Sequence, residues 1–453
     1  MLKTFTYTQL IVSHLLLGFL MYNFEPLRRV YFFILVGYWI LRIVLALPSK
    51  KTYTVLLACS YMIGAEVLLR TTGATLFYEI SKYTVILFIL MGMFFNGVKG
   101  SAWPYFLYLI LLVPSVLVAS GKLGLDLNFR SSVAFVLSGP VCLGISALYF
   151  HDRTLKHQQL LDALASMSMP VVSLMVYLFL YNPNIKDVLT GTGSNRALSG
   201  GFGPNQTATI LGLGIFCFTV RFFLKSPSLF LKLLNGGLLA LIAFRGIVTF
   251  SRGGIFTAIL MVGAFLVFLY GRSSYKVQQR LIGTSILFVM LGLATWFSSA
   301  NQTDGLIERR YANEDAAGRE KDDISTGRVD LFIGELDGFF SNPFFGVGAN
   351  GMKQERLDEF GKIIASHNEI SRLLSEHGIF GLIVLLILIF APLSYRSHQK
   401  SSIYFYAFFF FWFATINHSA MRLAAPGFIY ALALIRIKYE KPPLRRQLPQ
   451  PPA

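Results

Sequence analysis

Long apolar runs repeat along almost the whole chain, and short polar loops separate them. Fourteen runs can be counted, at 6–22, 30–47, 53–69, 82–97, 103–119, 132–150, 169–182, 204–224, 229–250, 253–270, 282–299, 369–392, 402–417 and 423–437. A helix of about 17 to 25 apolar residues crosses the hydrocarbon core of a bilayer. We therefore predict an all-α polytopic membrane protein with about 12 to 14 transmembrane helices. The short runs 169–182 and 423–437 are candidates for half-helices.

One long segment, 301–366, breaks this pattern. It holds 13 of the 23 acidic residues of the chain but only 8 of the 40 basic ones. We expect a large loop outside the membrane, between the last helical hairpins. The predicted organisation is an N-terminal transmembrane bundle (1–300), the loop with an amphipathic helix (301–368), C-terminal transmembrane helices (369–437) and a cytoplasmic tail (438–453).

Basic residues predict the orientation of the helices, because cytoplasmic loops carry an excess of Lys and Arg. The end of the chain, 436–446, holds five basic residues and one acidic residue, and we place it in the cytoplasm. Alternation of the helices then puts the basic loops inside, at 48–51, 151–157, 271–280 and 395–400. The acidic segment falls outside, together with the loop around Arg196, the break at 251–254 and the start of the helix after His367.

Composition agrees with a membrane protein: 54% of the residues are hydrophobic and the mean hydropathy is +0.59. The net charge of +17 does not indicate nucleic-acid binding here, because Lys and Arg lie mostly at helix ends. The three cysteines lie inside apolar runs without metal-ligand spacing. We expect no metal and no cofactor, since the chain has no D-x-D, H-E-x-x-H or Walker motif.

His367 is a candidate catalytic base. Ser366 and Glu369 have the S-x-x-E spacing of a capping box, which predicts that His367 is the first helical residue. The positive end of the helix dipole disfavours a second positive charge, so the imidazole is expected to be neutral and able to accept a proton. The alternative is that His367 only hydrogen-bonds a loop carbonyl.

Arg252 is a candidate anion-binding residue. It lies in the sequence T-F-S-R-G-G-I-F, which interrupts two apolar runs near the predicted membrane boundary. A guanidinium there is costly unless it is paired or solvated. Arg245 lies seven residues earlier, two helical turns away, so the two residues are predicted to line one cavity. The alternative is that both side chains extend to the outer headgroups.

Two further outer segments offer groups for an anion or a sugar. Arg328 opens a segment in which Val329, Phe332, Leu336 and Phe339 recur at helical spacing, which predicts an amphipathic helix on the outer surface. Its first turn suits an anion, although Arg328 can also be an ordinary charged residue on a solvated loop.

The Gly-rich loop 194–206 carries Arg196 and Asn205 and ends at Pro204, a good first helical residue. These two side chains are candidates for contact with a phosphate or a sugar. The alternative is that they are plain loop residues.

The order of these motifs resembles the O-antigen ligase/polymerase family of bacterial envelopes. The motifs are S-R-G-G, then G-R before an amphipathic segment, then P-F-F-G-V-G, then H-N-x(7)-E-x-G-x-x-G leading into a membrane helix. The similarity covers roughly residues 196–393. The chain departs from the family at Phe332, where Trp is common, and at Ile370, where Tyr or Phe is common.

The resemblance implies a GT-C type glycosyltransferase in the bacterial inner membrane with its active site facing the periplasm. Such an enzyme transfers a glycan from undecaprenyl pyrophosphate to lipid A-core, as a ligase, or to a lipid-linked glycan, as a polymerase. The family's catalytic residues carry over to Arg252, Arg328 and His367. We expect the arginines to stabilise the pyrophosphate leaving group and His367 to act on the acceptor hydroxyl, in a displacement that inverts the anomeric centre.

The substrate-binding candidates complete the predicted site, and they are Arg196, Asn205, Arg245, Asn368 and Glu369. For the role of general base, Glu369 and Glu376 are weaker candidates than His367, because Arg372 between them favours internal pairing. We predict that the outer ends of the helices at Arg252 and His367 meet Arg328 in one cavity open to the outer leaflet. The main alternative function is a transporter or flippase of lipid-linked glycans, which also needs intramembrane arginines. The sequence does not distinguish ligase from polymerase.

Overall fold

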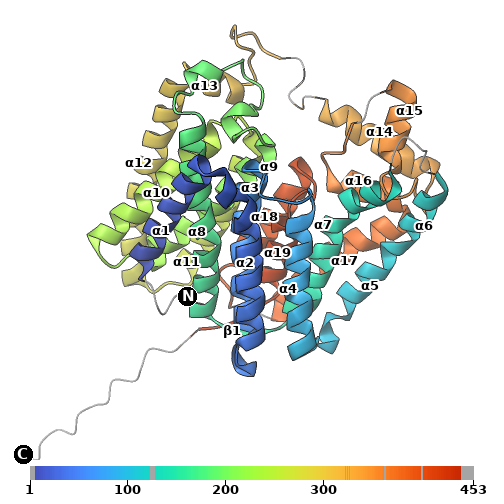
Figure 1. The fold of residues 1–453 in the computed structure, drawn as a ribbon, viewed down its shortest axis with the longest axis horizontal. Helices are drawn as coiled ribbons and strands as arrows, with labels where there is room; N and C mark the ends of the chain where they lie inside the picture. The colour runs from blue at the N-terminus through green and yellow to red at the C-terminus, as the bar shows by residue number, and fades with distance from the viewer. Residues whose placement is uncertain are drawn as a thin grey trace, which may run out of the picture.

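The computed structural model is almost entirely helical (Figure 1). It describes residues 6–122, 128–321, 323, 325, 327–361, 364–398 and 401–439. The first half of the chain forms helices α1 (Tyr7–Asn23), α2 (Glu25–Leu45), α3 (Lys51–Thr71), α4 (Ile80–Asn96), α5 (Trp103–Leu111), α6 (Val113–Lys122), α7 (Phe129–Phe150), α8 (His157–Tyr181) and α9 (Pro204–Leu224).

The second half alternates long helices with shorter ones. These are α10 (Leu229–Ile247), α11 (Arg252–Gly271), α12 (Tyr275–Gln302), α13 (Leu306–Tyr311), α14 (Arg328–Ser341), α15 (Gly351–Phe360), α16 (Glu369–His377), α17 (Ile379–His398), α18 (Phe405–His418) and α19 (Ala425–Ala433). Two short strands, β1 (Thr154–Lys156) and β2 (Arg436–Lys438), pair in parallel. The tail predicted at 438–453 lies outside the described residues from 440 onward.

The architecture confirms an all-α polytopic membrane protein. Nine helices within the described residues are long and apolar enough to cross a membrane, and the shorter α4 is also apolar. The expected number of about 12 to 14 spans is higher than nine because it counted shorter apolar runs, among them those that form α1, α18 and α19. One expectation is wrong: the run 169–182 is not a half-helix but the second part of the 25-residue helix α8, which continues through Pro170.

Close packing of small residues holds the centre of the bundle together. In α3, the Cα of Gly64 lies so near α8 that an added Cβ would be 2.0 Å from the Met167 carbonyl oxygen. Gly18 of α1 meets α8 in the same way, with the Ser173 carbonyl oxygen 2.5 Å from the position of a Cβ. Small residues allow this approach of helix backbones, which is typical of packing between membrane helices. In contrast, α12 is largely exposed along its length and lies at the periphery.

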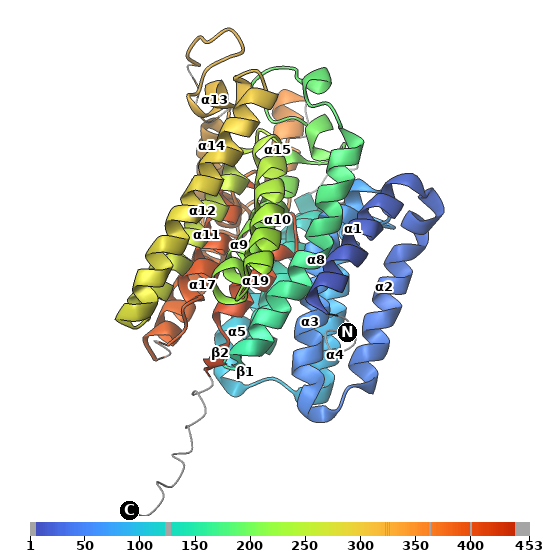
Figure 2. The same cartoon turned by 90° about the vertical axis from the view of Figure 1, so that its left-hand side faces the viewer.

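The two ends of the bundle differ in their loops (Figure 2). One end, which we call the strand end, carries β1 and β2, and here Asp152 pairs with Lys99 at 3.0 Å and with Arg436 at 2.8 Å. The opposite end, which we call the loop end, carries α13, α14 and α15. The basic segments 151–157 and 436–438 therefore lie at one end, and the acidic segment lies at the other.

The amphipathic helix predicted after Arg328 is present as α14, and its apolar face packs on the protein only in part, through the half-buried Leu336 and Phe339. Val329 and Phe332 are 54% and 36% exposed, whereas Glu335 and Gly338 are buried. An added Cβ at Gly338 would be 2.6 Å from the Met352 sulfur, so α14 approaches its neighbours through this small residue. The exposed apolar face agrees with the expected position on the outer surface.

Candidate active site

A cavity of about 100 Å³ at the loop end brings three arginines together. We call it the arginine cavity, and its lining residues are Ser194, Asn205, Ser251, Arg252, Gly253, Arg310, Ser325 and Arg328. They come from the loop before α9, the starts of α9, α11 and α14, and from α13. Arg252 and Arg328 thus share a cavity as predicted, whereas His367, which was predicted to meet them there, is not among its lining residues.

Arg252 is held in the arginine cavity by the glycines that follow it. It is the first residue of α11, and its Nη1 donates a hydrogen bond of 3.3 Å to the Arg310 carbonyl oxygen. A Cβ added to Gly253 would lie 2.5 Å from the His418 ring, and one added to Gly254 would lie 2.5 Å from Ala208. The sequence S-R-G-G therefore lets the start of α11 contact α9 and α18, with the guanidinium at the helix end.

Arg310 completes the arginine group, and the sequence analysis missed it. The residue is buried, and its Nε donates a hydrogen bond of 3.2 Å to the Phe250 carbonyl oxygen. Burial, followed by the nearby charges of Arg252 and Arg328, lowers the pKa of Arg310 to about 10. The three positive charges lie close enough to disfavour one another, so the cavity favours binding of an anion.

Arg328 is the first residue of α14, as predicted. Gly327 before it adopts a left-handed conformation with φ of 76°, and the carboxylate of Asp323 accepts its backbone N–H. Burial lowers the pKa of Arg328, and the positive charges of Arg252 and Arg422 lower it further. Arg328 is therefore electrostatically linked to the arginine cavity on one side and to Arg422 on the other.

The other three predicted residues of this region have different environments. Asn205 lines the arginine cavity, and its Oδ1 accepts a hydrogen bond of 2.8 Å from Ser251 Oγ. Arg196 is exposed and is not among the lining residues. Arg245 is completely buried, with its Nη2 donating to the Leu198 carbonyl oxygen at 3.0 Å and its guanidinium 5.2 Å from the centre of the Phe179 ring.

The prediction that Arg245 and Arg252 share one helical face is wrong. Helix α10 ends at Ile247, and a turn follows in which Phe250 has a φ of 59°. Arg252 begins a different helix, so a spacing of seven residues does not place the two side chains on one face. The apolar runs on both sides of the turn hide the break in the sequence.

The prediction that His367 begins a helix is also wrong, because Asn368 and not Ser366 is the capping residue. Asn368 Oδ1 accepts hydrogen bonds from the backbone N–H groups of Ile370, at 2.8 Å, and Ser371, at 3.2 Å. Helix α16 therefore begins at Glu369, and His367 lies in the loop before it. Asn satisfies the free N–H groups of a first turn as well as Ser does, so both residues were possible caps.

His367 is neutral at ordinary pH, as expected, but the helix dipole is not the cause. Burial lowers the pKa of His367 to about 4, and the positive charges of Arg422, Arg328 and Arg356 and the nearby His418 act in the same direction. Its Nδ1 is buried without a hydrogen-bond partner among the described residues. A neutral imidazole with an unsatisfied nitrogen lies beside cations that can hold an anion.

The side chains of Asn368 and Glu369 make hydrogen bonds and ion pairs within the protein. Besides capping α16, Asn368 donates from Nδ2 to Asn417 Oδ1 at 3.1 Å. Both Glu369 and Glu376 pair with Arg372, the latter at 2.6 Å, and all three side chains are buried. The predicted internal pairing of this stripe is therefore present.

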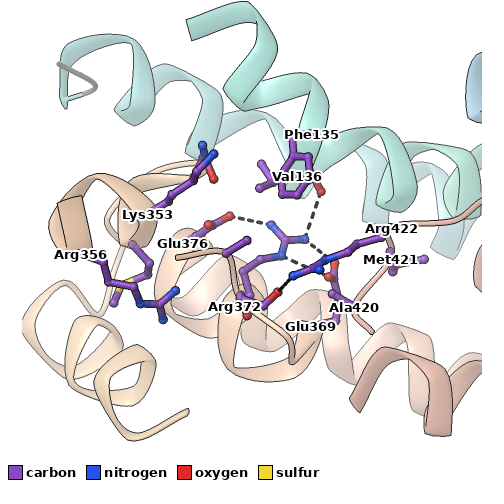
Figure 3. A pocket seen from close by; sticks show the side chains of 14 residues that line it. Phe135, Val136, Lys353, Arg356, Glu369, Arg372, Glu376, Ala420, Met421 and Arg422 are labelled. Atoms are coloured by element: carbon purple, nitrogen blue, oxygen red, sulfur yellow. Dashed lines mark hydrogen bonds and ion pairs between the residues drawn. The ribbon is translucent and has the colours of Figure 1, made fainter. Parts of the chain in front are cut away.

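A second, much smaller pocket of about 20 Å³ adjoins the His367 loop (Figure 3). We call it the Arg422 pocket, and its lining residues are Phe135, Val136, Asn350, Met352, Lys353, Arg356, Ala365, Ser366, Glu369, Arg372, Glu376, Ala420, Met421 and Arg422. Figure 3 shows Arg372 between its two carboxylates, with Arg422 beside them. The pocket borders α7, α15 and α16, to the right in Figure 1, whereas α9 and α13 of the arginine cavity lie to the left.

Arg422 fixes the loop that carries His367. Its Nη2 donates a hydrogen bond of 2.7 Å to the Ser366 carbonyl oxygen, while its Nε has no partner among the described residues. The sequence analysis missed Arg422, although it has the signal that pointed to Arg252: an arginine at the edge of an apolar run, in N-H-S-A-M-R-L-A-A-P.

Comparison with known proteins identifies a family for part of the chain. A family model described as O-antigen ligase matches residues 237–386, which include Arg252, Arg310, Arg328 and His367. The search among curated proteins finds no match to the chain. The matched region contains the motifs from which the resemblance was inferred. The chain is therefore a multi-pass membrane protein in which residues 237–386, a third of its length, match the O-antigen ligase family.

Proposed function

We propose that this protein transfers a glycan from undecaprenyl pyrophosphate to an acceptor hydroxyl at the periplasmic face of the bacterial inner membrane. The acceptor is lipid A-core for a ligase, or a second lipid-linked glycan for a polymerase. The observation that carries the proposal is the grouping of Arg252, Arg310 and Arg328 in one cavity, with a neutral His367 near Arg328. The family match supports the coarser statement that the chain has a ligase role in a membrane.

The arginine cavity suits the pyrophosphate of the donor. A planar guanidinium donates two parallel hydrogen bonds to phosphate oxygens, so three of them can hold a pyrophosphate without a divalent ion. As the bond to the anomeric carbon breaks, the leaving pyrophosphate gains negative charge. Fixed positive groups stabilise that charge more in the transition state than in the ground state.

His367 would accept the proton of the acceptor hydroxyl, or orient that hydroxyl, as it attacks the anomeric carbon from the side opposite the pyrophosphate. In this step the new glycosidic bond forms, the bond between the anomeric carbon and the pyrophosphate breaks, and the hydroxyl proton passes to the imidazole. A bound pyrophosphate would offset the charges of Arg328 and Arg422 and so raise the pKa of His367 from its low value in the empty site. Its strength as a base would then increase when donor is bound.

The orientation follows from the charges of the two ends of the bundle. The strand end carries the basic segments, which mark the cytoplasm, so the loop end would face the periplasm. Both cavities lie at helix ends there. This favours an enzyme that works at the outer membrane surface over a transporter, for which the arginines would be expected midway along the helices.

Reconstituted transfer from a purified lipid-linked donor, with EDTA present, tests the proposal. Arg252→Lys keeps the charge but loses the planar fork, and we expect it to lose most of the activity while the protein stays folded. A rate equal to that of the wild type, or transfer abolished by EDTA, would show that the arginines do not take the place of a metal ion. The glycans of a deletion strain separate the two acceptors: single repeat units on the core indicate a lost polymerase, and polymer on undecaprenyl pyrophosphate indicates a lost ligase.

A further inference from the structure

A third hollow, an open groove of about 630 Å³, lies next to the Arg422 pocket on the surface of the loop end. We call it the aromatic groove. Phe135 and Lys353 line both the pocket and the groove, so the two are adjacent. The pocket in turn contains Ser366, next to His367. The groove thus ends beside the pocket that borders the His367 loop, and neither shares a lining residue with the arginine cavity.

Aromatic rings form one part of this groove. Phe77 and Tyr83 are 46% and 39% exposed, and their ring centroids are 5.8 Å apart. Tyr78 contacts Phe135 with a centroid separation of 6.0 Å, and Lys353 Nζ lies 5.4 Å from the centre of the Phe135 ring. Exposed ring faces offer flat apolar surfaces against which the C–H faces of a sugar can pack.

Hydrogen-bonding groups accompany the rings. Asn128, Arg130, Ser131 and Glu79 also line the groove. Inside the pocket, Asn350 is 2% exposed, and its Nδ2 has no hydrogen-bond partner among the described residues. An unpartnered donor in a cavity costs free energy unless a ligand satisfies it, and Arg422 Nε is in the same condition. Rings with interspersed donors and acceptors match the two faces of a saccharide.

We infer that the aromatic groove binds the saccharide chain of the acceptor, with its inner end at the Arg422 pocket beside the His367 loop. The inference rests on the proposed function for the identity of the acceptor. An inverting displacement needs the acceptor hydroxyl on the side opposite the pyrophosphate, and the pocket reaches the His367 loop from there.

Binding is measured first, without donor, so that it does not depend on the transfer chemistry. The probe is the oligosaccharide released by mild acid from the source cell's own acceptor glycolipid, titrated into the full chain in nanodiscs. We expect Phe77→Ala and Tyr83→Ala each to weaken binding about five-fold, the size of one ring contact. Phe94→Ala is the matched control, because Phe94 is an exposed aromatic residue on the same helix α4 as Tyr83 and is 84% exposed. It should leave binding unchanged.

Steady-state transfer then assigns the groove to the acceptor. The same two variants should raise the acceptor KM by a similar factor and leave kcat and the donor KM unchanged. Unaltered oligosaccharide binding, a changed donor KM, or competition by vesicles of anionic lipid in place of oligosaccharide would each overturn the inference. Failure of the proposed donor mechanism can be distinguished from failure of this inference. Full activity of Arg252→Lys would refute the arginine mechanism, whereas the groove variants would still change oligosaccharide binding.

Discussion

Two groups of arginines lie at the loop end and differ in their counterions. In α15 and α16, Arg356 pairs with Glu335 at 2.6 Å, and Arg372 pairs with two carboxylates. In the arginine cavity, Arg310 makes its hydrogen bond to a backbone carbonyl, and neither it nor Arg328 has a carboxylate within ion-pair distance among the described residues.

The comparison shows how one residue type takes two roles. A guanidinium with its own carboxylates is neutralised and fixes the position of the helix that carries it. Arg310, whose guanidinium is bonded to a backbone carbonyl, keeps its charge for a ligand, and the nearby charges of Arg252 and Arg328 add to the positive potential of the cavity. The first group is expected to determine stability, and the second group is expected to determine turnover.

Because Arg372 belongs to the group of arginines with their own carboxylates, Arg372→Met is expected to unfold the protein or to destabilise it strongly. The change leaves Glu369 and Glu376 buried without their ion-pair partner, and breaking such a pair costs about 3 to 5 kcal/mol. Thermal unfolding in detergent measures the effect. Arg319→Met on the exposed loop, where the side chain is 81% exposed, should leave the melting temperature unchanged. Equal melting temperatures for the two variants would remove the distinction.

His367→Ala is expected to lower kcat by about 10² to 10⁴-fold, the usual contribution of a general base. Donor binding should remain close to that of the wild type, because the imidazole acts on the acceptor hydroxyl. The test is single-turnover transfer together with a separate donor titration. A large loss of donor affinity with unchanged turnover would assign His367 to the donor instead.

Arg328→Lys should lower kcat/KM by about 10²-fold at an unchanged melting temperature. The ammonium keeps the charge but cannot bind two phosphate oxygens with a planar fork. Arg319→Lys is the control, since it makes the same substitution in an arginine that pairs with Asp315 on the surface. A small effect in both variants would indicate that the cavity needs charge alone.

A smaller effect is expected in the pH dependence. His367 faces Arg328 of α14, Arg356 of α15, His418 of α18 and Arg422, and its pKa in the empty site is about 4. The imidazole is neutral above that value and takes a proton as the pH falls through it, so kcat/KM should hold down to mildly acidic pH. Bound pyrophosphate raises this pKa, so the acid limb of kcat should lie at higher pH than that of kcat/KM. Coincident limbs would contradict the proposed coupling.

The sequence predicted the features that depend on local pattern. Apolar run length was enough for the membrane helices, and the glycines after Arg252 and before Arg328 marked two helix starts that meet in one cavity. The stripe of Glu369, Arg372 and Glu376 followed from helical spacing alone. In each case neighbours along the chain determine the outcome.

Features that depend on distant contacts were not predictable in this way. Arg310 enters the cavity because Phe250, 60 residues earlier, offers its carbonyl oxygen, and nothing beside Arg310 in the acidic segment marks it. Arg422 reaches the Ser366 carbonyl across 56 positions. The cap of α16 went to Asn368 because Ser366 is used by the loop, where its Oγ donates to the Asn368 carbonyl oxygen at 2.9 Å.

The most direct test of the arginine cavity is the affinity of the protein in nanodiscs for undecaprenyl pyrophosphate, measured for Arg310→Lys and Arg309→Lys. Arg309 is the adjacent residue on α13 and bonds the Ala316 carbonyl oxygen, outside the cavity lining. We predict that Arg310→Lys weakens binding about tenfold, the loss of a charge-assisted contact of roughly 1.5 kcal/mol, while Arg309→Lys binds like the wild type. Equal affinities for both variants, with intact folding, would contradict the assignment of this cavity to the pyrophosphate.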